Sequence, residues 1–192
     1  MVTITNQPDA VLLGTLRHAY GRVAYSHKTH EKMGDRIAMN TTFLKWAELI
    51  LIVLTTGGTL AVLIGEERTH EVVTVILAAL SLLVTLYQFR FNPDDVGRAH
   101  RSTAVRLWHV REKYCSLIAD LRSGAVSVDQ IRASRDHLLD ELKGIYEPAP
   151  QSDSRAYKAA QKALKVNEEL SFTDAEIDEL LPTSLRSGNL NS

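Results

Sequence analysis

Two long apolar stretches dominate the pattern of hydrophobic and polar positions. Residues 46–65 (WAELILIVLTTGGTLAVLIG) contain one charged side chain, Glu48, and residues 72–89 (VVTVILAALSLLVTLYQF) contain none. A helix needs about 20 apolar residues to cross a hydrocarbon core about 30 Å thick. A buried helix of a soluble bundle rarely lacks charge over five turns. We therefore predict two transmembrane spans.

The charges beside these stretches predict their orientation. Six residues, 66–71, join the spans, so the spans form an antiparallel hairpin with both ends on one side. Residues 1–45 and 90–113 each carry a net charge of +3, whereas the joining loop has Arg68 as its one cation. The positive-inside rule then places both termini in the cytoplasm and the joining loop outside, and in a bacterium the membrane concerned is the inner membrane. The side chains expected to contact lipid headgroups are Lys45, Trp46, Arg90, Arg98 and Arg101.

Outside the spans, apolar residues recur every third and fourth position, as in packed helices. This spacing predicts one helix before the hairpin and two after it, at 96–123 and 128–146, that fold back as an αα-hairpin. Asn92-Pro93 interrupts the chain, and we expect Asp94 or Asp95 to cap the next helix. The apolar seams contain Tyr20, Val23, His27 and His30 before the hairpin and Leu107, Val110, Tyr114, Leu117 and Leu121 after it.

Turn and capping signals complete the outline. Gly124 stands where a helix end requires a left-handed residue. The segments SVDQ (127–130) and TDAE (173–176) have the form of capping boxes. Two short helices, 153–167 and 174–181, are expected in the tail, and no segment alternates with the period of a strand.

The predicted fold class is an all-α membrane protein. A two-span transmembrane hairpin joins a cytoplasmic helical bundle, made of the N-terminal helix and the αα-hairpin, and a short helical tail that becomes disordered from about Ser184. The predicted parts are the N-terminal helix (9–42), the transmembrane hairpin (43–91, with spans 46–65 and 72–89), the αα-hairpin (96–147) and the acidic tail (148–192).

Composition narrows the function. With 45% hydrophobic residues and a net charge of −1, the chain is neither a disulfide miniprotein nor a generally basic nucleic-acid binder, so we expect no direct contact with nucleic acid. Charge is unevenly distributed, because residues 114–192 sum to −4. The single cysteine, Cys115, is expected to be a small buried residue in a reducing compartment rather than a nucleophile.

The sequence contains no constellation of catalytic residues, so we predict no enzyme activity and no cofactor. The TTGGT run at 55–59 lies within a span with no cation beside it, which argues against a phosphate loop. The His27-x-x-His30-Glu31 motif allows metal ligation, packed histidines between helices, or a pH-sensitive seam. Both histidines lie on the apolar seam, which favours packed histidines.

Small residues at four-residue spacing mark both spans. Such residues let transmembrane helices approach closely, and Ser or Thr can hydrogen-bond across the contact. The pattern allows packing inside one hairpin and packing between protomers, and its polar row either lines a pore or sits in a dry interface. Two spans alone enclose no water path, so a pore requires a homo-oligomer. The residues concerned are Thr55, Thr56, Gly57, Thr59, Ala61, Ser81 and Thr85.

Several segments together resemble a known family. They are AYGRVAYSHKTHEKMGDR before the hairpin and, after it, HRSTAVRLWHVREKYCSLIADLRSG, RDHLLDELKGIYEPAP, AYKAAQKALKVNEELSFTDAEIDELLP and LR. Over roughly residues 10–186 the chain is similar to the SLATT family, two-transmembrane effector domains of bacterial nucleotide-signalling conflict systems. The resemblance implies an effector that forms a pore or disrupts the inner membrane when a separate sensor or nucleotide-signalling partner reports infection. It implies no catalytic residues.

Two functions from different classes follow. In the first, the protein is a membrane effector of an anti-phage system that oligomerises and acts through its spans. In the second, it is a non-conducting membrane anchor or scaffold, and the acidic tail docks a cytoplasmic partner. An anchor tolerates replacement of residues 46–89 by an unrelated hairpin, whereas an effector does not.

Overall fold

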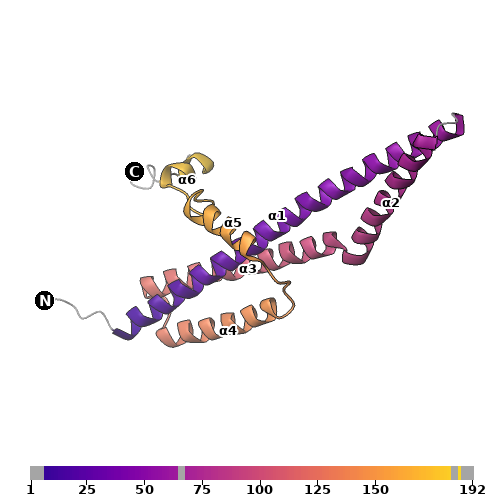
Figure 1. Cartoon of the computed structure of the whole chain (residues 1–192). Helices are drawn as coiled ribbons and strands as arrows, with labels where there is room; N and C mark the ends of the chain where they lie inside the picture. Colours follow the sequence, from indigo (N-terminus) through magenta and orange to yellow (C-terminus); the bar gives the residue numbers. More distant parts are fainter. Residues whose placement is uncertain (1–6, 65–67, 183–185, 187–192) are drawn as a thin grey trace.

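The computed structural model describes residues 7–64, 68–182 and 186, and its secondary structure there is entirely helical (Figure 1). Residues 66 and 67 of the joining loop, and most of the segment expected to be disordered from Ser184, lie outside the described residues. The helices are α1 (Gln7–Ile64), α2 (Arg68–Phe91), α3 (Pro93–Ser123), α4 (Val128–Tyr146), α5 (Ser154–Lys165) and α6 (Asp174–Leu180).

α1 is a single helix of 58 residues. At 1.5 Å per residue it is about 87 Å long. It contains both the predicted N-terminal helix and the first apolar span, with no break near residue 43. Residues 38–48 contain neither Gly nor Pro, so nothing in the sequence interrupts the helix there.

α2 runs antiparallel to α1, because Thr85 near its end contacts Glu48 while Thr74 near its start faces Gly58. A Cβ on Gly58 would collide with the Thr74 hydroxyl unless that side chain moved, so glycine favours this close crossing. Thr55 and Ser81 are half-buried on the facing sides of the two helices. Small side chains therefore bring the two spans together within one chain.

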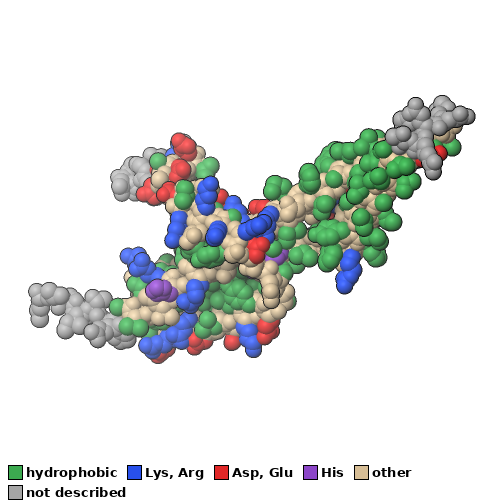
Figure 2. Space-filling model, in the orientation of Figure 1, with side chains coloured by type: hydrophobic (Ala, Val, Ile, Leu, Met, Phe, Trp, Pro, Cys, Tyr) green, Lys and Arg blue, Asp and Glu red, His purple; other side chains and the backbone are tan. Residues whose placement is uncertain are grey.

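The outer surface of this hairpin is apolar (Figure 2). Both helices are long and apolar enough to cross a membrane, and no residue of their most apolar windows is buried inside the protein. Leu63 is 77% exposed and Phe89 is 87% exposed. Such a large apolar surface exposed to water is unfavourable in a soluble monomer. Hydrocarbon is the environment that suits it.

A bend at Asn92 separates α2 from α3. Asn92 has a left-handed conformation (φ 39°, ψ 61°), and Pro93 follows at the first turn of α3. The prediction that Asp94 or Asp95 caps this helix is wrong. The N-cap residue is Asn92, without a side-chain cap, because the left-handed bend precedes the proline; Asp95 instead pairs with Asn92 and Arg98.

Beyond the bend, α3 packs along the part of α1 that precedes the span, α4 folds back on α3, and α5 lies on α1 (Figure 1). The predicted capping boxes of α4 and α6 are confirmed, as is the left-handed Gly124 (φ 67°).

Cys115 is exposed, contrary to the prediction, because Tyr114 and Leu117 occupy the buried face of α3. The core includes Leu12, Leu16, Val23, Leu107, Val110, Tyr114, Leu117, Ile131, Leu138 and Ile145.

Two glycines set the closest approach of α1 and α3. A Cβ on Gly34 would lie 2.9 Å from Cγ of Arg101, and one on Gly97 would lie 3.2 Å from Cγ2 of Ile37. Both glycines are buried, and the half-buried Ile37 beside Gly97 has less room to move than the exposed Arg101 beside Gly34. The contact lies between the bend at Asn92 and the buried histidines, and it holds α3 against α1.

Replacing Gly97 by Leu tests this contact. The larger side chain forces α3 away from α1, and overpacking of this kind typically destabilises a protein by about 1–3 kcal/mol. We expect a lower Tm for the detergent-solubilised protein, followed by circular dichroism. Gly14→Ala is the control: nothing lies within 4 Å of its Cβ position, so the helix should gain about 0.5–1 kcal/mol. An unchanged Tm for Gly97→Leu would contradict the close contact.

Candidate functional site

The most elaborate polar cluster lies where α1, α3 and the tail meet, and we call it the polar junction. α1 contributes most of its side chains, α3 one histidine, and the tail two carboxylates. Arg36 is ten residues from Trp46, so the junction begins about 15 Å along α1 from the first span. Its members are His27, Lys28, His30, Glu31, Lys32, Arg36, His100, Asp153 and Glu169.

A lysine pair on α1, Lys28 and Lys32, binds the carboxylate of Glu169 from the tail. Lys28 Nζ lies 2.7 Å from Glu169 Oε2 and 2.8 Å from Glu31 Oε1, and Lys32 Nζ lies 3.0 Å from both Glu169 oxygens. Lys28 is only 4% exposed. Burial lowers its pKa, but the hydrogen bonds to Glu169 and Glu31 outweigh burial and raise the pKa. The buried ammonium therefore stays charged and requires these carboxylates.

The same bonds act on the carboxylate. Hydrogen bonds from Lys28 and then Lys32 lower the pKa of Glu169 to about 2. Glu168, with φ 52°, ends the turn after α5, and the backbone N–H of Glu169 donates to the Ala163 carbonyl at 3.1 Å. This turn directs Glu169 back toward α1.

A second ion pair fixes the start of α5. Arg36 Nη1 lies 3.2 Å from Asp153 Oδ1. The same carboxylate accepts a hydrogen bond from the Ala156 N–H at 2.8 Å as the N-cap of α5. The Arg36 hydrogen bond, with that of Ala156, lowers the pKa of Asp153 to about 2. The tail is thus attached to α1 at both ends of α5.

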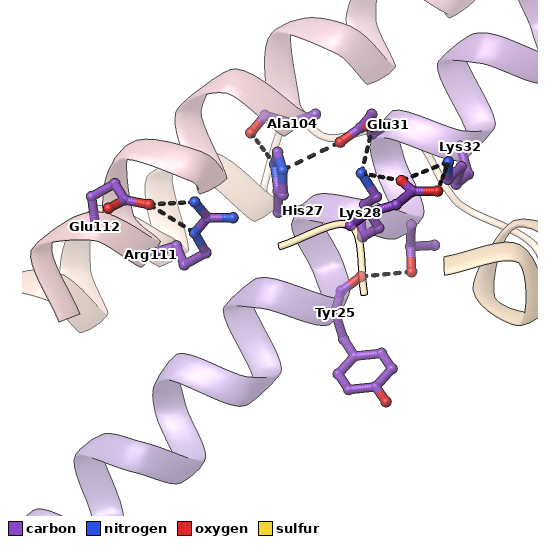
Figure 3. Close-up of polar contacts among 10 residues, drawn as sticks. Tyr25, His27, Lys28, Glu31, Lys32, Ala104, Arg111 and Glu112 are labelled. Atoms are coloured by element: carbon purple, nitrogen blue, oxygen red, sulfur yellow. Dashed lines mark hydrogen bonds and ion pairs between the residues drawn. The ribbon is translucent and has the colours of Figure 1, made fainter. Parts of the chain in front are cut away.

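His27 bridges α1 and α3. Its Nδ1 donates to the Ala104 carbonyl at 2.9 Å, and its Nε2 lies 3.4 Å from Glu31 Oε2 (Figure 3). Burial lowers the pKa of His27, although Ala104 and Glu31 act in the opposite direction. The ring is therefore neutral at neutral pH and holds the two helices together through the backbone of α3.

His30 faces His100 across the same interface. Their Nδ1 atoms are 2.9 Å apart, so one ring must donate and the other accept. Burial, and then the proximity of His100, lowers the pKa of His30 to about 4, and burial also lowers that of His100. The Nε2 of His100 is buried without a hydrogen-bond partner in the described part of the chain. Protonation of both rings would place two N–H donors against each other.

These contacts bear on the three interpretations of the His27-x-x-His30 motif. In the described ranges, no group of three or more His, Cys, Asp or Glu side chains is placed to hold a metal ion. His27 and His30 instead contact different partners on α3, which fits packed histidines between helices.

In the apolar hairpin, the small residues divide between two faces. Thr55 and Ser81 lie half-buried between α1 and α2, and Thr85 hydrogen-bonds to Glu48. Gly57 faces the other way: nothing lies within 4 Å of its Cβ position. Thr56, Thr59 and Ala61 are also exposed. The hydroxyls of Thr56 and Thr59 donate to backbone carbonyls of their own helix at 2.8 Å.

The cations expected at the membrane surface mostly have carboxylate partners. Lys45 lies 2.6 Å from Asp94, Arg98 pairs with Asp95, and Arg101 lies 3.5 Å from Asp35. Arg90 instead lies over the Phe91 ring, 5.9 Å from its centre, and Trp46 is 62% exposed. The Lys45–Asp94 pair ties α1 to α3 just beyond the spans. All five side chains remain open to solvent or lipid.

The seam residues lie together between α1, α3 and α4. Val23, His27 and His30 are buried on α1, and Leu107, Val110, Tyr114 and Leu117 are buried on α3, whereas Tyr20 and Leu121 are half-buried beside them. The prediction from sequence missed His100, although it lies seven residues before Leu107 and so continues the α3 seam by one heptad. It also missed Glu169, for which an isolated carboxylate in a turn gives no signal, and the contacts of Glu48 with Thr85 and Gln88.

The fold is a helical bundle joined to two helices that are long and apolar enough to cross a membrane. Residues 12–176 match the SMODS and SLOG-associating 2TM effector domain family 4, and the chain belongs to this family of two-transmembrane effector domains. The expected SLATT membership is thereby confirmed. No curated protein and no solved structure matches the chain.

The buried histidines predict acid sensitivity. The unfolded chain binds a proton at His30 near pH 6.5, while folding lowers this pKa to about 4. Stability is therefore present above pH 6.5 and is lost as pH falls toward 4. One pKa unit corresponds to about 1.4 kcal/mol, so the contribution of His30 is on the order of 3 kcal/mol.

Thermal unfolding of the solubilised protein at pH 8, 6 and 5 measures this loss. The paired carboxylates Glu169 and Asp153 have pKa values of about 2, so their protonation destabilises the protein at lower pH. The change in stability between pH 8 and 5 is therefore assigned to the histidines. His30→Asn should flatten the dependence, and the exposed-site variant His137→Asn should not. Equal pH dependence in all three proteins would refute the assignment.

Glu169→Gln tests the attachment of the tail. The variant leaves Lys28 buried without its closest partner, and hydrogen bonds to charged groups contribute about 1.5–3 kcal/mol. We expect amide hydrogen exchange in α5 to accelerate by about tenfold or more, measured by mass spectrometry. Glu179→Gln, at an exposed position of α6, is the control. Unchanged exchange in Glu169→Gln would show that this carboxylate does not hold the tail.

Proposed function

We propose that this protein is a bacterial inner-membrane effector of an anti-phage or conflict system, whose hairpins associate into an oligomer that forms a pore or disrupts the membrane. A separate sensor or nucleotide-signalling partner provides the trigger. The family, named for two-transmembrane effectors that associate with SMODS and SLOG, supports the effector role. Both termini lie in the cytoplasm in this proposal, which rests on the excess of Lys and Arg beside the spans.

The observation that carries the proposal is the outward face of the first span. The contact between α1 and α2 uses Gly58, whereas Gly57 and Ala61 lie outside it. Closely packing helices in lipid use small residues four apart, and a lone hairpin has no use for a second such face. A neighbouring protomer that packs there would bring the exposed Thr56 and Thr59 near the contact.

The polar junction provides a mechanical link to the trigger. The tail is attached to α1 through buried Lys28 and through Arg36, and α1 continues without a break into the span. A partner that displaces the tail therefore acts on the helix that enters the membrane. The buried lysine would then need another carboxylate or water, so displacement is favourable only when a partner supplies it.

Gly57→Leu tests the packing face. Because the position is open within one chain, the variant should fold and insert normally. We expect it to abolish the depolarisation that strong expression of the natural chain produces in bacteria, measured with a voltage-sensitive dye. High expression favours oligomers by mass action. Val53→Leu, at an exposed position that already has a large side chain, should depolarise like the natural chain.

Two results would count against the proposal. Undiminished depolarisation by Gly57→Leu would show that protomers do not pack through this face. Full biological activity after replacement of residues 46–89 by an unrelated hairpin would favour the alternative, a non-conducting anchor. Gly58→Leu serves as the reference for a disrupted hairpin, because the new side chain would clash with Thr74 within one chain.

A further inference from the structure

A groove of about 780 Å³ lies between α1 and α4, and Tyr114 of α3 lines it. It forms because α4 packs on α3 and leaves the neighbouring face of α1 open. We call it the α1–α4 groove. Its walls include Arg17 and Arg22 from α1 and Leu139, Leu142 and Lys143 from α4.

The groove is suited to carboxylates. None of the described residues that line it is acidic. Arg17 and Arg22 are exposed, and neither makes an ion pair or hydrogen bond with the described residues. Tyr114, whose hydroxyl has no hydrogen-bond partner in the described chain, is completely buried at the base of the groove.

α6 has the complementary chemistry. Four of its seven residues are acidic, and none is buried. Its larger apolar residues, Ile177 and Leu180, are three positions apart on one face, and they are 41% and 80% exposed. The capping box at Thr173 orders the helix before it meets a partner, which lowers the entropy lost on binding.

The positions of the two surfaces indicate a second copy of the chain. α6 and α4 lie on opposite sides of α1 (Figure 1). The segment before α6 is held to α1 by Glu169, which Lys28 and Lys32 bind. The groove begins at Ser26, so both surfaces lie at similar levels along α1.

We propose that α6 of one protomer docks in the α1–α4 groove of the next, with its carboxylates facing Arg17 and Arg22 and its apolar face on Leu139 and Leu142. This inference rests on the proposed oligomer and names the contact that builds it outside the membrane. Because donor and acceptor surfaces differ, the contact repeats head to tail, and a ring forms if the rotation between protomers completes a circle.

Docking of α6 in the α1–α4 groove would have a low affinity without further contacts between the protomers. A seven-residue helix covers far less than the roughly 800 Å² per partner of a stable interface. Hairpins confined to one membrane raise the effective concentration of α6 beside a neighbouring groove. Docking and packing of the spans therefore reinforce each other.

Cysteine cross-linking in bacterial membranes tests the docking. In a Cys115→Ser background of the full chain, Leu139→Cys and Ile177→Cys are combined and oxidised with copper phenanthroline. We expect covalent dimers and higher species on a denaturing gel. Ser134→Cys with Ile177→Cys is the matched control, because Ser134 lies on α4 outside the groove; it should remain monomeric.

Charge exchange adds specificity. Arg22→Glu should reduce cross-linking several-fold, Glu179→Arg should do the same, and the two together should restore it. Arg132→Glu, on α4 but outside the groove, should have no effect. If the yield of cross-linked species were the same in all these charge variants, the assignment of the groove would be overturned.

Native gels of the same membranes separate this inference from the proposed function. Intact oligomers without α6 cross-links would overturn the docking and leave the effector proposal standing. Monomers alone would contradict both. A cross-link formed only within one chain would overturn the head-to-tail arrangement, because α6 would then fill the groove of its own protomer.

Discussion

The structure depends on one constraint: α1 must be a single uninterrupted helix, both inside and outside the membrane. Its first part carries the buried face on which α3 and α5 pack, and its last part carries the apolar surface that requires lipid. Gly34 and Gly97 hold α3 against it, and Lys45 with Asp94 ties the two together beside the spans. The extramembrane bundle and the hairpin therefore cannot move independently, since a stiff helix joins them.

The polar junction exploits this stiffness. Neutral buried histidines and a buried lysine make the α1–α3–tail contact specific yet conditional: each group needs a particular partner, and loss of that partner is unfavourable. Apolar packing alone would hold the tail without such sensitivity to charge. In the proposed effector, a partner that supplies another carboxylate or cation would replace this contact and release the tail.

Much of this architecture was predictable from sequence. Long uncharged stretches and heptad spacing indicate the spans and the packed helices, and the caps at Ser127 and Thr173 follow from local chemistry. The N-cap of α3 could not be predicted from sequence, because the left-handed conformation of Asn92 depends on how α2 meets α3. Periodicity alone did not reveal which of Gly57 and Gly58 faces α2, since adjacent residues differ by about 100° around a helix. The contact between Glu169 and Lys28 depends on the tertiary fold.

The central claim is that the associated spans themselves breach the membrane. Current across a planar lipid bilayer containing the purified protein tests it most directly, with a variant whose residues 46–89 are replaced by an unrelated hairpin measured beside it. The account predicts discrete current steps that grow more frequent with protein density and are missing in the hairpin-replaced variant. A silent bilayer in which the natural protein is demonstrably oligomeric, or equal currents from both proteins, would contradict it.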